Sequence, residues 1–166
     1  MNRKYSVRDY LNLIRKIKKK LPLVSLTTDV LVGFPGESEA DFQDTADLIE
    51  EVVPLKTHIF PYSRRDTTLA ANNGCLEVAP LIIKERILRL EKTTSLCALK
   101  FQKQFLGQDL DVLIEERPDG AAGLWQGHTD NYLKIGVISN QNLKNKIINV
   151  SLKDIKKSFL LAEITD

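Results

Sequence analysis

Cysteine is rare in this 166-residue sequence, and neither a long apolar run nor a secretory leader is visible. No apolar stretch approaches the roughly 18 residues that cross a bilayer, and the first ten residues, MNRKYSVRDY, lack the apolar core of a signal peptide. Cys75 and Cys97 stand 22 positions apart, and neither lies near His58 or His128 at a spacing used for metal ligands. We therefore expect a cytoplasmic protein without a membrane partner, a disulfide framework or a Cys/His metal site.

Proline and glycine are also infrequent, with 6 and 8 residues, whereas 43% of the residues are hydrophobic and 28% are charged. This composition excludes collagen-like, low-complexity and disordered chains. It predicts one ordinary domain or two small ones, with enough apolar residues to build a core.

The charge is distributed unevenly along the chain. Residues 1–106 carry a net charge of +4 and residues 107–166 one of −2, and residues 1–20 alone hold 8 Lys or Arg against one Asp. Such a surface attracts polyanions, but a solvated helix face carries the same charges without a ligand. Both interpretations are compatible with the sequence.

The first part of the chain alternates helices and strands. Capping-box patterns at Ser6 and Ser38 precede apolar positions at three- and four-residue steps, which predicts helices over 7–20 and about 39–53. The apolar, β-branched segment at 25–34 predicts a strand covered on both faces, and residues 56–63 are predicted to form a second strand. A polar turn at 64–74 then leads into a long helix from Pro80 to Gly107. Because two parallel strands do not make a sheet core alone, we expect residues 1–106 to be the closing portion of a larger α/β domain.

The second part changes from a helical period to a period of two. Five short strands are predicted, at 110–115, 124–128, 132–138, 147–152 and 159–164, separated by turn sequences such as ERPDGAAG and SNQNLKN. Five short strands in about 60 residues are typical of a small closed barrel. We therefore expect an α/β domain over 1–106 and an all-β domain over 107–166.

The loop GFPGES, at 33–38, lies between a predicted buried strand and a capped helix, where α/β folds place ligand loops. It matches neither the P-loop nor the dinucleotide fingerprint. Gly33 and Gly36 permit close backbone approach, and amides at the start of the next helix could face an anionic group. A purely structural turn explains the same residues.

The order of these motifs resembles a known family. The run MNRKYSVRDYLNLIRKIKKKLP, then TTDVLVGFPGESEADF, HIFPYSRRDTTLAA and IKERILRL, is similar to the carboxyl-terminal part of the radical S-adenosylmethionine domain of MiaB-like tRNA methylthiotransferases. The segments GQDLDVLIEE, WQGHTDNYLKIGV and NKIINVSL resemble the TRAM domain, a small β-barrel that closes these enzymes. The resemblance covers essentially the whole chain and is nearest to the branch acting on threonylcarbamoyladenosine.

The resemblance implies a tRNA-modifying enzyme that adds a methylthio group to C2 of an adenosine beside the anticodon. The full-length enzyme uses S-adenosylmethionine and two 4Fe-4S clusters. Cys75 and Cys97 cannot supply the C-x-x-x-C-x-x-C ligands of the radical cluster, so we expect no cofactor bound to this chain and no activity of the chain alone. Its expected partners are tRNA and the amino-terminal domains of the same enzyme.

Two groups of site residues are predicted, the first from the resemblance and the second from the resemblance together with charge and aromatic character. The cofactor side is expected to include Gly33, Phe34, Pro35, Gly36, Glu37, Tyr62, Ser63 and Arg65. Here the sequence reads SRRDTTLAA where SPREGTPAA is usual, which leaves the roles of Arg64 and Arg65 open. The expected RNA contacts, which combine stacking surfaces with a late basic strip, are Trp125, His128, Asn131, Tyr132, Lys144, Lys146 and Lys153.

Structural roles are open for the same residues, since Asn131 could cap a turn and Tyr132 could belong to the barrel core. A second hypothesis for the chain as a whole is a free-standing RNA-binding module that performs no chemistry.

Overall fold

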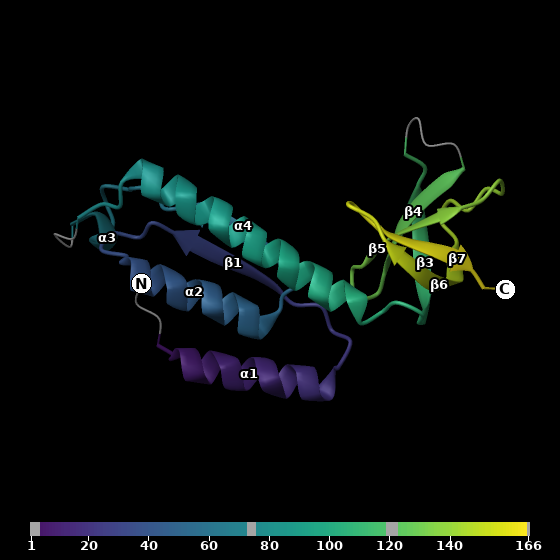
Figure 1. Cartoon of the computed structure of the whole chain (residues 1–166), viewed down its shortest axis with the longest axis horizontal. Coiled ribbons are helices and arrows are strands. Elements are labelled where there is room, and N and C mark those ends of the chain that lie inside the picture. Colours follow the sequence, from purple (N-terminus) through teal and green to yellow (C-terminus); the bar gives the residue numbers. More distant parts are fainter. Residues whose placement is uncertain (1–3, 73–75, 119–122, 166) are drawn as a thin grey trace. The chain divides into compact units, whose positions relative to one another are not determined.

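A computed structural model of the chain describes residues 4–72, 76–118 and 123–165. The chain divides into two compact units, residues 1–99 and 100–166, and each is described by itself (Figure 1). None of the described helices is both long and apolar enough to span a membrane.

The first unit begins with the predicted helix α1, Val7–Lys20. The Ser6 hydroxyl accepts from the Asp9 amide at 3.2 Å, and the Asp9 carboxylate accepts from the Ser6 amide at 3.0 Å, which completes a capping box. The hydrogen bond from the Ser6 hydroxyl is the main reason that the pKa of Asp9 is lowered. The helix ends at Lys20, and its C-cap Leu21 stands directly before Pro22, because the residue before proline avoids the helical region.

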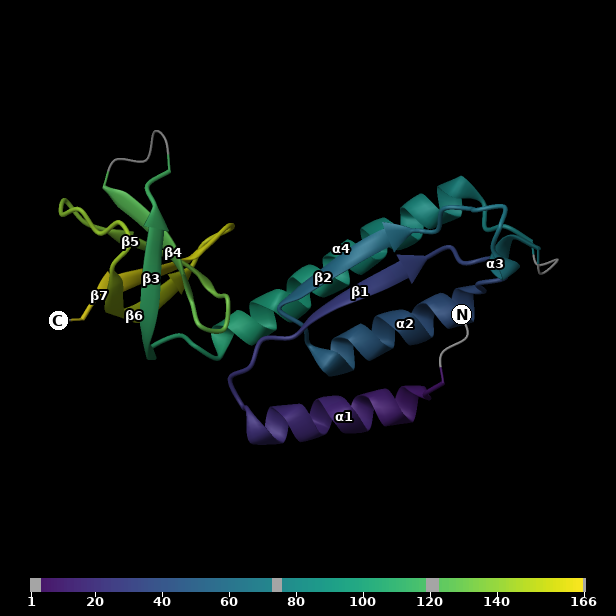
Figure 2. The ribbon, with the colours of Figure 1, turned by 180° about the vertical axis from the view of Figure 1, so that it is seen from behind.

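A parallel strand–helix–strand unit follows. Strand β1 is Thr27–Val32, helix α2 is Glu39–Val52 and strand β2 is Lys56–Pro61. The strands pair in parallel from Thr27 opposite Lys56 to Val32 opposite Pro61. Helix α1 lies beside α2 (Figures 1 and 2), where Arg15 pairs with Glu51 at 2.6 Å.

Helices α2 and α4, Pro80–Lys103, cover one face of this sheet. The core between them contains Val32, Phe42, Ala46, Ile49, Leu90 and Cys97. Side chains alternate along each strand, so the opposite face of the same sheet presents Asp29, His58 and Phe60, which are all exposed. The first unit therefore has one covered and one open sheet face.

The segment between β2 and α4 differs from the prediction. A short helix, α3, Leu69–Asn72, lies within the stretch expected to be a turn. The Thr68 side chain accepts a hydrogen bond from the Ala71 amide, which favours a helical turn over an open loop. Helix α4 ends at Lys103 and turns bring the chain to Gly107, so the predicted helix end is four residues late.

The second unit contains the predicted closed barrel of five strands. They are β3 Asp109–Glu116, β4 Leu124–Thr129, β5 Lys134–Ile138, β6 Ile147–Ile155 and β7 Leu160–Ile164. Their order around the barrel is β3-β4-β5-β7-β6, and only β5 and β7 pair in parallel. Inward-facing side chains fill the interior, among them Val112, Ile114, Ile135, Val137, Val150 and Leu152. Strand β5 begins at Lys134, so the predicted strand start at Tyr132 is wrong.

Candidate functional site

The loop after β1 is shaped by contacts within the first unit. Gly33 has a φ of +81°, and a Cβ at this position would lie 2.5 Å from Cδ1 of Ile83 on α4. The Gly36 amide donates to the Leu76 carbonyl at 3.0 Å. The absent side chain of Gly33 therefore accommodates a neighbouring helix of the same chain.

Glu37 and Arg86 form a buried ion pair beneath this loop. Their side chains are 10% and 5% exposed, and Nη1 of Arg86 lies 2.6 Å from Oε2 of Glu37. The same carboxylate oxygen accepts from the Gly33 amide at 2.8 Å. Arg86 also contacts the Glu37 carbonyl and the Glu39 carboxylate, at 3.2 and 3.3 Å. The pair links the loop, the start of α2 and the second turn of α4.

These contacts change the interpretation of the loop as a cofactor site. One oxygen of the Glu37 carboxylate is engaged by the Gly33 amide and by Arg86, and Pro35 is buried. The first turn of α2 carries Glu39 and Asp41. Hydrogen bonds from Arg89 and Ser38, respectively, are the main causes of the lowered pKa values of these two carboxyls, and lower values favour the negative charge that repels an anion. The Glu37 carboxylate therefore has a structural role within its own chain, and its cofactor role stays a prediction.

Tyr62 lies at the end of β2, edge-on to Phe34 with ring centroids 5.6 Å apart. Its hydroxyl is buried without a hydrogen-bond partner among the described residues. The ring lines an apolar groove of about 440 Å³ together with Pro61, Pro80, Ile83, Lys84, Ile87, Leu88 and Glu91.

Ser63 and Arg65 are exposed. Arg64 is paired with Asp66 and Glu77, whereas Arg65 makes no ion pair within the described part of the chain. Of the two neighbouring arginines, Arg65 is the one that remains available to a ligand.

Within residues 4–72, 76–118 and 123–165, no three His, Cys, Asp or Glu side chains are arranged so that they could hold a metal ion. Cys97 is buried and its Sγ lies 3.6 Å from the Ile49 carbonyl oxygen. Cys75 lies outside the described residues.

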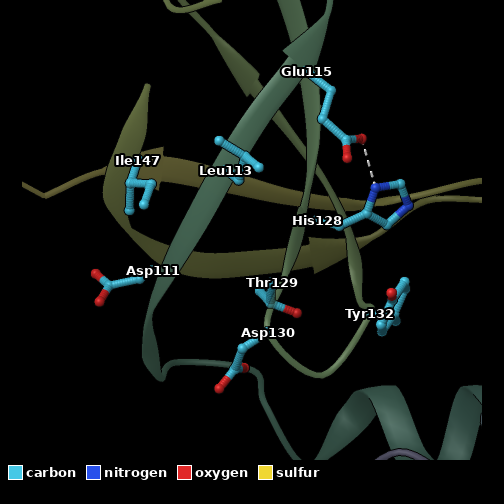
Figure 3. A pocket seen from close by; sticks show the side chains of 8 residues that line it. All are labelled: Asp111, Leu113, Glu115, His128, Thr129, Asp130, Tyr132 and Ile147. Carbon is cyan, nitrogen blue, oxygen red and sulfur yellow. Dashed lines mark hydrogen bonds and ion pairs between the residues drawn. The ribbon is translucent and has the colours of Figure 1, made fainter. Parts of the chain in front are cut away.

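The second unit has a surface hollow of about 340 Å³, shown in Figure 3. Alternation along β3 points Asp111, Leu113 and Glu115 outward, while Val112 and Ile114 fill the barrel. The remaining lining residues come from β4, from the turn after it and from the start of β6, and they are His128, Thr129, Asp130, Tyr132 and Ile147.

A row of outward side chains crosses four strands at this hollow. Leu113 on β3 pairs with Ile147 on β6 and with His128 on β4, and His128 pairs with Lys134 on β5. Directly opposite residues point to the same face of a sheet. The row therefore runs from an aliphatic end, through an imidazole, to an ammonium group.

The turn between β4 and β5 presents Tyr132. The Thr129 hydroxyl donates to Asn131 Oδ1 at 2.6 Å and accepts from the Leu133 amide at 3.0 Å, which confirms a turn-forming role for Asn131. Tyr132 adopts a left-handed backbone with φ +62°, and the residue is 76% exposed. The alternative that Tyr132 belongs to the core is therefore wrong.

His128 lies between Glu115 and Tyr132 in Figure 3. Its Nδ1 is 2.7 Å from Glu115 Oε2, and its ring centroid is 6.4 Å from that of Tyr132. A carboxylate only accepts hydrogen bonds, so Nδ1 carries the proton in this contact. The contact fixes the imidazole beside the hollow.

Trp125 does not fit the stacking role expected from the sequence. The residue is 8% exposed, and it lies opposite the inward-facing Val137 in the barrel core. The Arg117 guanidinium covers the ring at 5.9 Å from its centroid. An unpaired base cannot reach this indole in the folded barrel.

The three predicted lysines are exposed, and they occupy different places. Lys146 directly precedes Ile147 at the rim of the hollow, and Lys144 lies in the same turn. Lys153 is paired with Glu163 at 3.4 Å. Sequence reasoning missed Leu113, Lys134 and Ile147, although the period-two alternation of β3 and β5 would have placed the first two on the outer face.

Comparisons with known proteins place these features in context. The chain is 37% identical over 156 residues to a tRNA-2-methylthio-N(6)-dimethylallyladenosine synthase of Acetivibrio thermocellus, covering 94% of the chain and 32% of that protein. A synthase of the same name from Lachnoclostridium phytofermentans is 36% identical over all of the chain and 36% of its own length. The threonylcarbamoyladenosine tRNA methylthiotransferase MtaB of Bacillus subtilis is 33% identical, over 92% of the chain and 34% of that enzyme.

These relatives include both kinds of adenosine-modifying enzyme, so the predicted branch stays a prediction. No family model matches the chain. A solution structure of a Methanococcus maripaludis protein is 26% identical and covers 37% of this chain and 80% of its own, with a TM-score of 0.30, which is too low to bear on the fold. Over essentially its whole length the chain is therefore related to MiaB-like tRNA methylthiotransferases, as its motifs predicted, and it spans about a third of the length of these relatives.

Proposed function

We propose that this chain is part of a tRNA methylthiotransferase that adds a methylthio group to C2 of a modified adenosine beside the anticodon. The observation that carries the proposal is the similarity to such enzymes over nearly the whole chain. Residues 1–106 would contribute strands and helices to the radical S-adenosylmethionine domain, and residues 107–166 would be the TRAM domain that holds the RNA.

The one-sided sheet of the first unit supports this division. In an α/β barrel, helices cover the outer face of each strand and the other face points to the interior. Helices α2 and α4 cover one face of β1 and β2, and the opposite face is open with Asp29, His58 and Phe60 exposed. We propose that this open face lines the interior of the larger barrel.

The closed barrel of the second unit supports a role in RNA binding. Small five-stranded barrels such as the OB-fold bind oligonucleotides on outward strands and adjoining loops. Here the outer surface carries an exposed aromatic, Tyr132, and the lysines Lys144 and Lys146 are also exposed. Aromatic and cationic side chains together are the usual components of single-strand binding surfaces.

Binding of an unmodified tRNA at several salt concentrations tests the RNA role. Replacing Lys144, Lys146 and Lys153 by Ala should weaken binding and lower the slope of log K against log salt by up to about 3, one for each phosphate that the variant no longer neutralises. The matched control replaces Lys84, Lys92 and Lys100 of α4, which should change the slope less. Equal effects of the two triple variants would contradict a specific role for the barrel.

A hybrid enzyme tests the enzymatic part. The third of Bacillus subtilis MtaB that matches this chain is replaced by the chain, and the methylthio nucleoside in tRNA is measured by mass spectrometry. We expect the hybrid to form the product, and the adenosine that it modifies assigns the branch. A folded hybrid that binds tRNA and forms no product would contradict the proposal.

A further inference from the structure

We propose that the hollow on the second unit holds a single unpaired nucleobase that carries an exocyclic amino group. The inference rests on the proposed function only in taking the ligand to be RNA. It places one nucleobase of the RNA in the hollow formed by β3, β4, the start of β6 and the turn after β4.

The floor and walls of the hollow suit the face of a base. Leu113 and Ile147 form an aliphatic surface, and Tyr132 and His128 add two rings with centroids 6.4 Å apart. Base–aromatic stacking tolerates any base, because every base has a π face. The volume of about 340 Å³ leaves room for one base and its ribose.

The backbone of Tyr132 points to a ligand role for its ring. A bulky side chain is uncommon at positive φ, where glycine and asparagine are favoured. At φ +62° the backbone of Tyr132 is strained. Because the residue is 76% exposed, packing of its side chain does not offset this strain. Strained residues of this kind cluster at binding sites.

The charges of the hollow exclude a phosphate and favour an amino group. Three carboxylates line it, those of Asp111, Glu115 and Asp130. Carboxylates accept hydrogen bonds and repel phosphate oxygens. The exocyclic amino groups of adenine, cytosine and guanine are donors, whereas uracil presents carbonyl oxygens on either side of its single N–H.

Lysines stand next to both ends of the cross-strand row. Lys146 precedes Ile147 at one end of the cross-strand row, and Lys134 pairs with His128 at the other. A single strand that crosses the row would place a base over the carboxylates and its neighbouring phosphates near the two ammonium groups. This pattern is complementary to one nucleotide of a strand, and a duplex cannot present a base in this way.

Equilibrium binding of fluorescent hexaadenylate and hexauridylate to the full chain tests the inference. We expect hexaadenylate to bind more tightly, and Tyr132→Ala to weaken it about tenfold while Tyr132→Phe retains it. Tyr132→Gly relieves the backbone strain, so it should raise the unfolding midpoint and still weaken binding. A purely structural tyrosine cannot give that combination. Ile147→Ala should weaken binding, whereas Ile138→Ala is the matched control, since both isoleucines are 71% exposed and only Ile147 lines the hollow.

Glu115→Gln distinguishes a base from a phosphate in the hollow. Loss of the preference for hexaadenylate supports the amino-group contact, and an equal gain of affinity for both oligonucleotides would overturn it. If RNA binds and the Tyr132 and Ile147 variants bind as the wild type does, the base site is wrong although the RNA role stands. If neither oligonucleotide nor tRNA binds at low salt, the proposed function itself fails. Binding of a lysine-rich peptide in the hollow that RNA does not displace would assign it to a protein partner and overturn the inference.

Discussion

The buried pair of Arg86 and Glu37 allows a quantitative test of how the first unit is held together. Replacing Arg86 by Met keeps most of the aliphatic volume and removes the guanidinium. The Glu37 carboxylate, whose side chain is 10% exposed, then loses its 2.6 Å partner, and among the described residues it keeps only the Gly33 amide as a donor. Removing one partner of a buried ion pair typically costs about 3–5 kcal/mol, because the remaining charge is uncompensated.

The cost can be measured separately in the two units. Far-UV circular dichroism follows the helices, which lie largely in the first unit, and the fluorescence of Trp125, the one tryptophan of the sequence, follows the barrel. The free energy of unfolding falls by about 1–3 kcal/mol per molar urea, so the urea midpoint of the helical transition should be about 2 M lower in Arg86→Met than in the wild type. The tryptophan transition should stay where it is.

A double variant provides the control. Glu37→Gln combined with Arg86→Met leaves no buried charge, and the Gln oxygen can still accept from the Gly33 amide. We expect the double variant to recover more than half of the lost stability. The reasoning is refuted if Arg86→Met costs less than about 1 kcal/mol, or if adding Glu37→Gln makes the unit still less stable.

Two further predictions concern local geometry. Gly127→Ala should destabilise the barrel by at least about 3 kcal/mol, because the added Cβ would lie 2.0 Å from the Leu113 carbonyl oxygen. The control is Gly107→Ala, whose Cβ has no neighbour within 4 Å and whose φ of +76° alone costs about 1–2 kcal/mol. Equal tryptophan-fluorescence midpoints for the two variants would contradict this. The pKa of Asp41 is lowered below 3.8, chiefly by the Ser38 hydroxyl, so its charge stabilises the folded state above that pH, and the contribution is lost as the pH falls through the folded value. The difference in free energy of unfolding between wild type and Asp41→Asn should therefore be constant above about pH 5 and should shrink as the pH falls below 3.8. A difference that does not depend on pH would show that the charge has no role.

Local signals predicted much of the fold. Both capping boxes are present where Ser6 and Ser38 predicted them, because these contacts join residues three positions apart. The five strands of the barrel also followed from alternation and turn residues alone.

The sequence could not predict contacts between distant residues. Glu37 was expected to face a cofactor, and its partner Arg86 lies 49 positions further on, where no local pattern connects the two. Trp125 was expected on the surface because aromatic rings stack on bases, but the pairing of β4 with β5 turns it inward. Tyr132 was compatible with a core or a surface role until the left-handed turn directed it outward.

The central claim is that the outer face of the barrel holds RNA. Amide chemical shifts of the isotopically labelled 18.8 kDa chain, recorded with and without an unmodified tRNA anticodon stem-loop, test it most directly. We predict shifts concentrated at 113–115, 128–134 and 146–147, which weaken as salt is raised. Shifts confined to residues 4–99, or none at low salt, would contradict the claim.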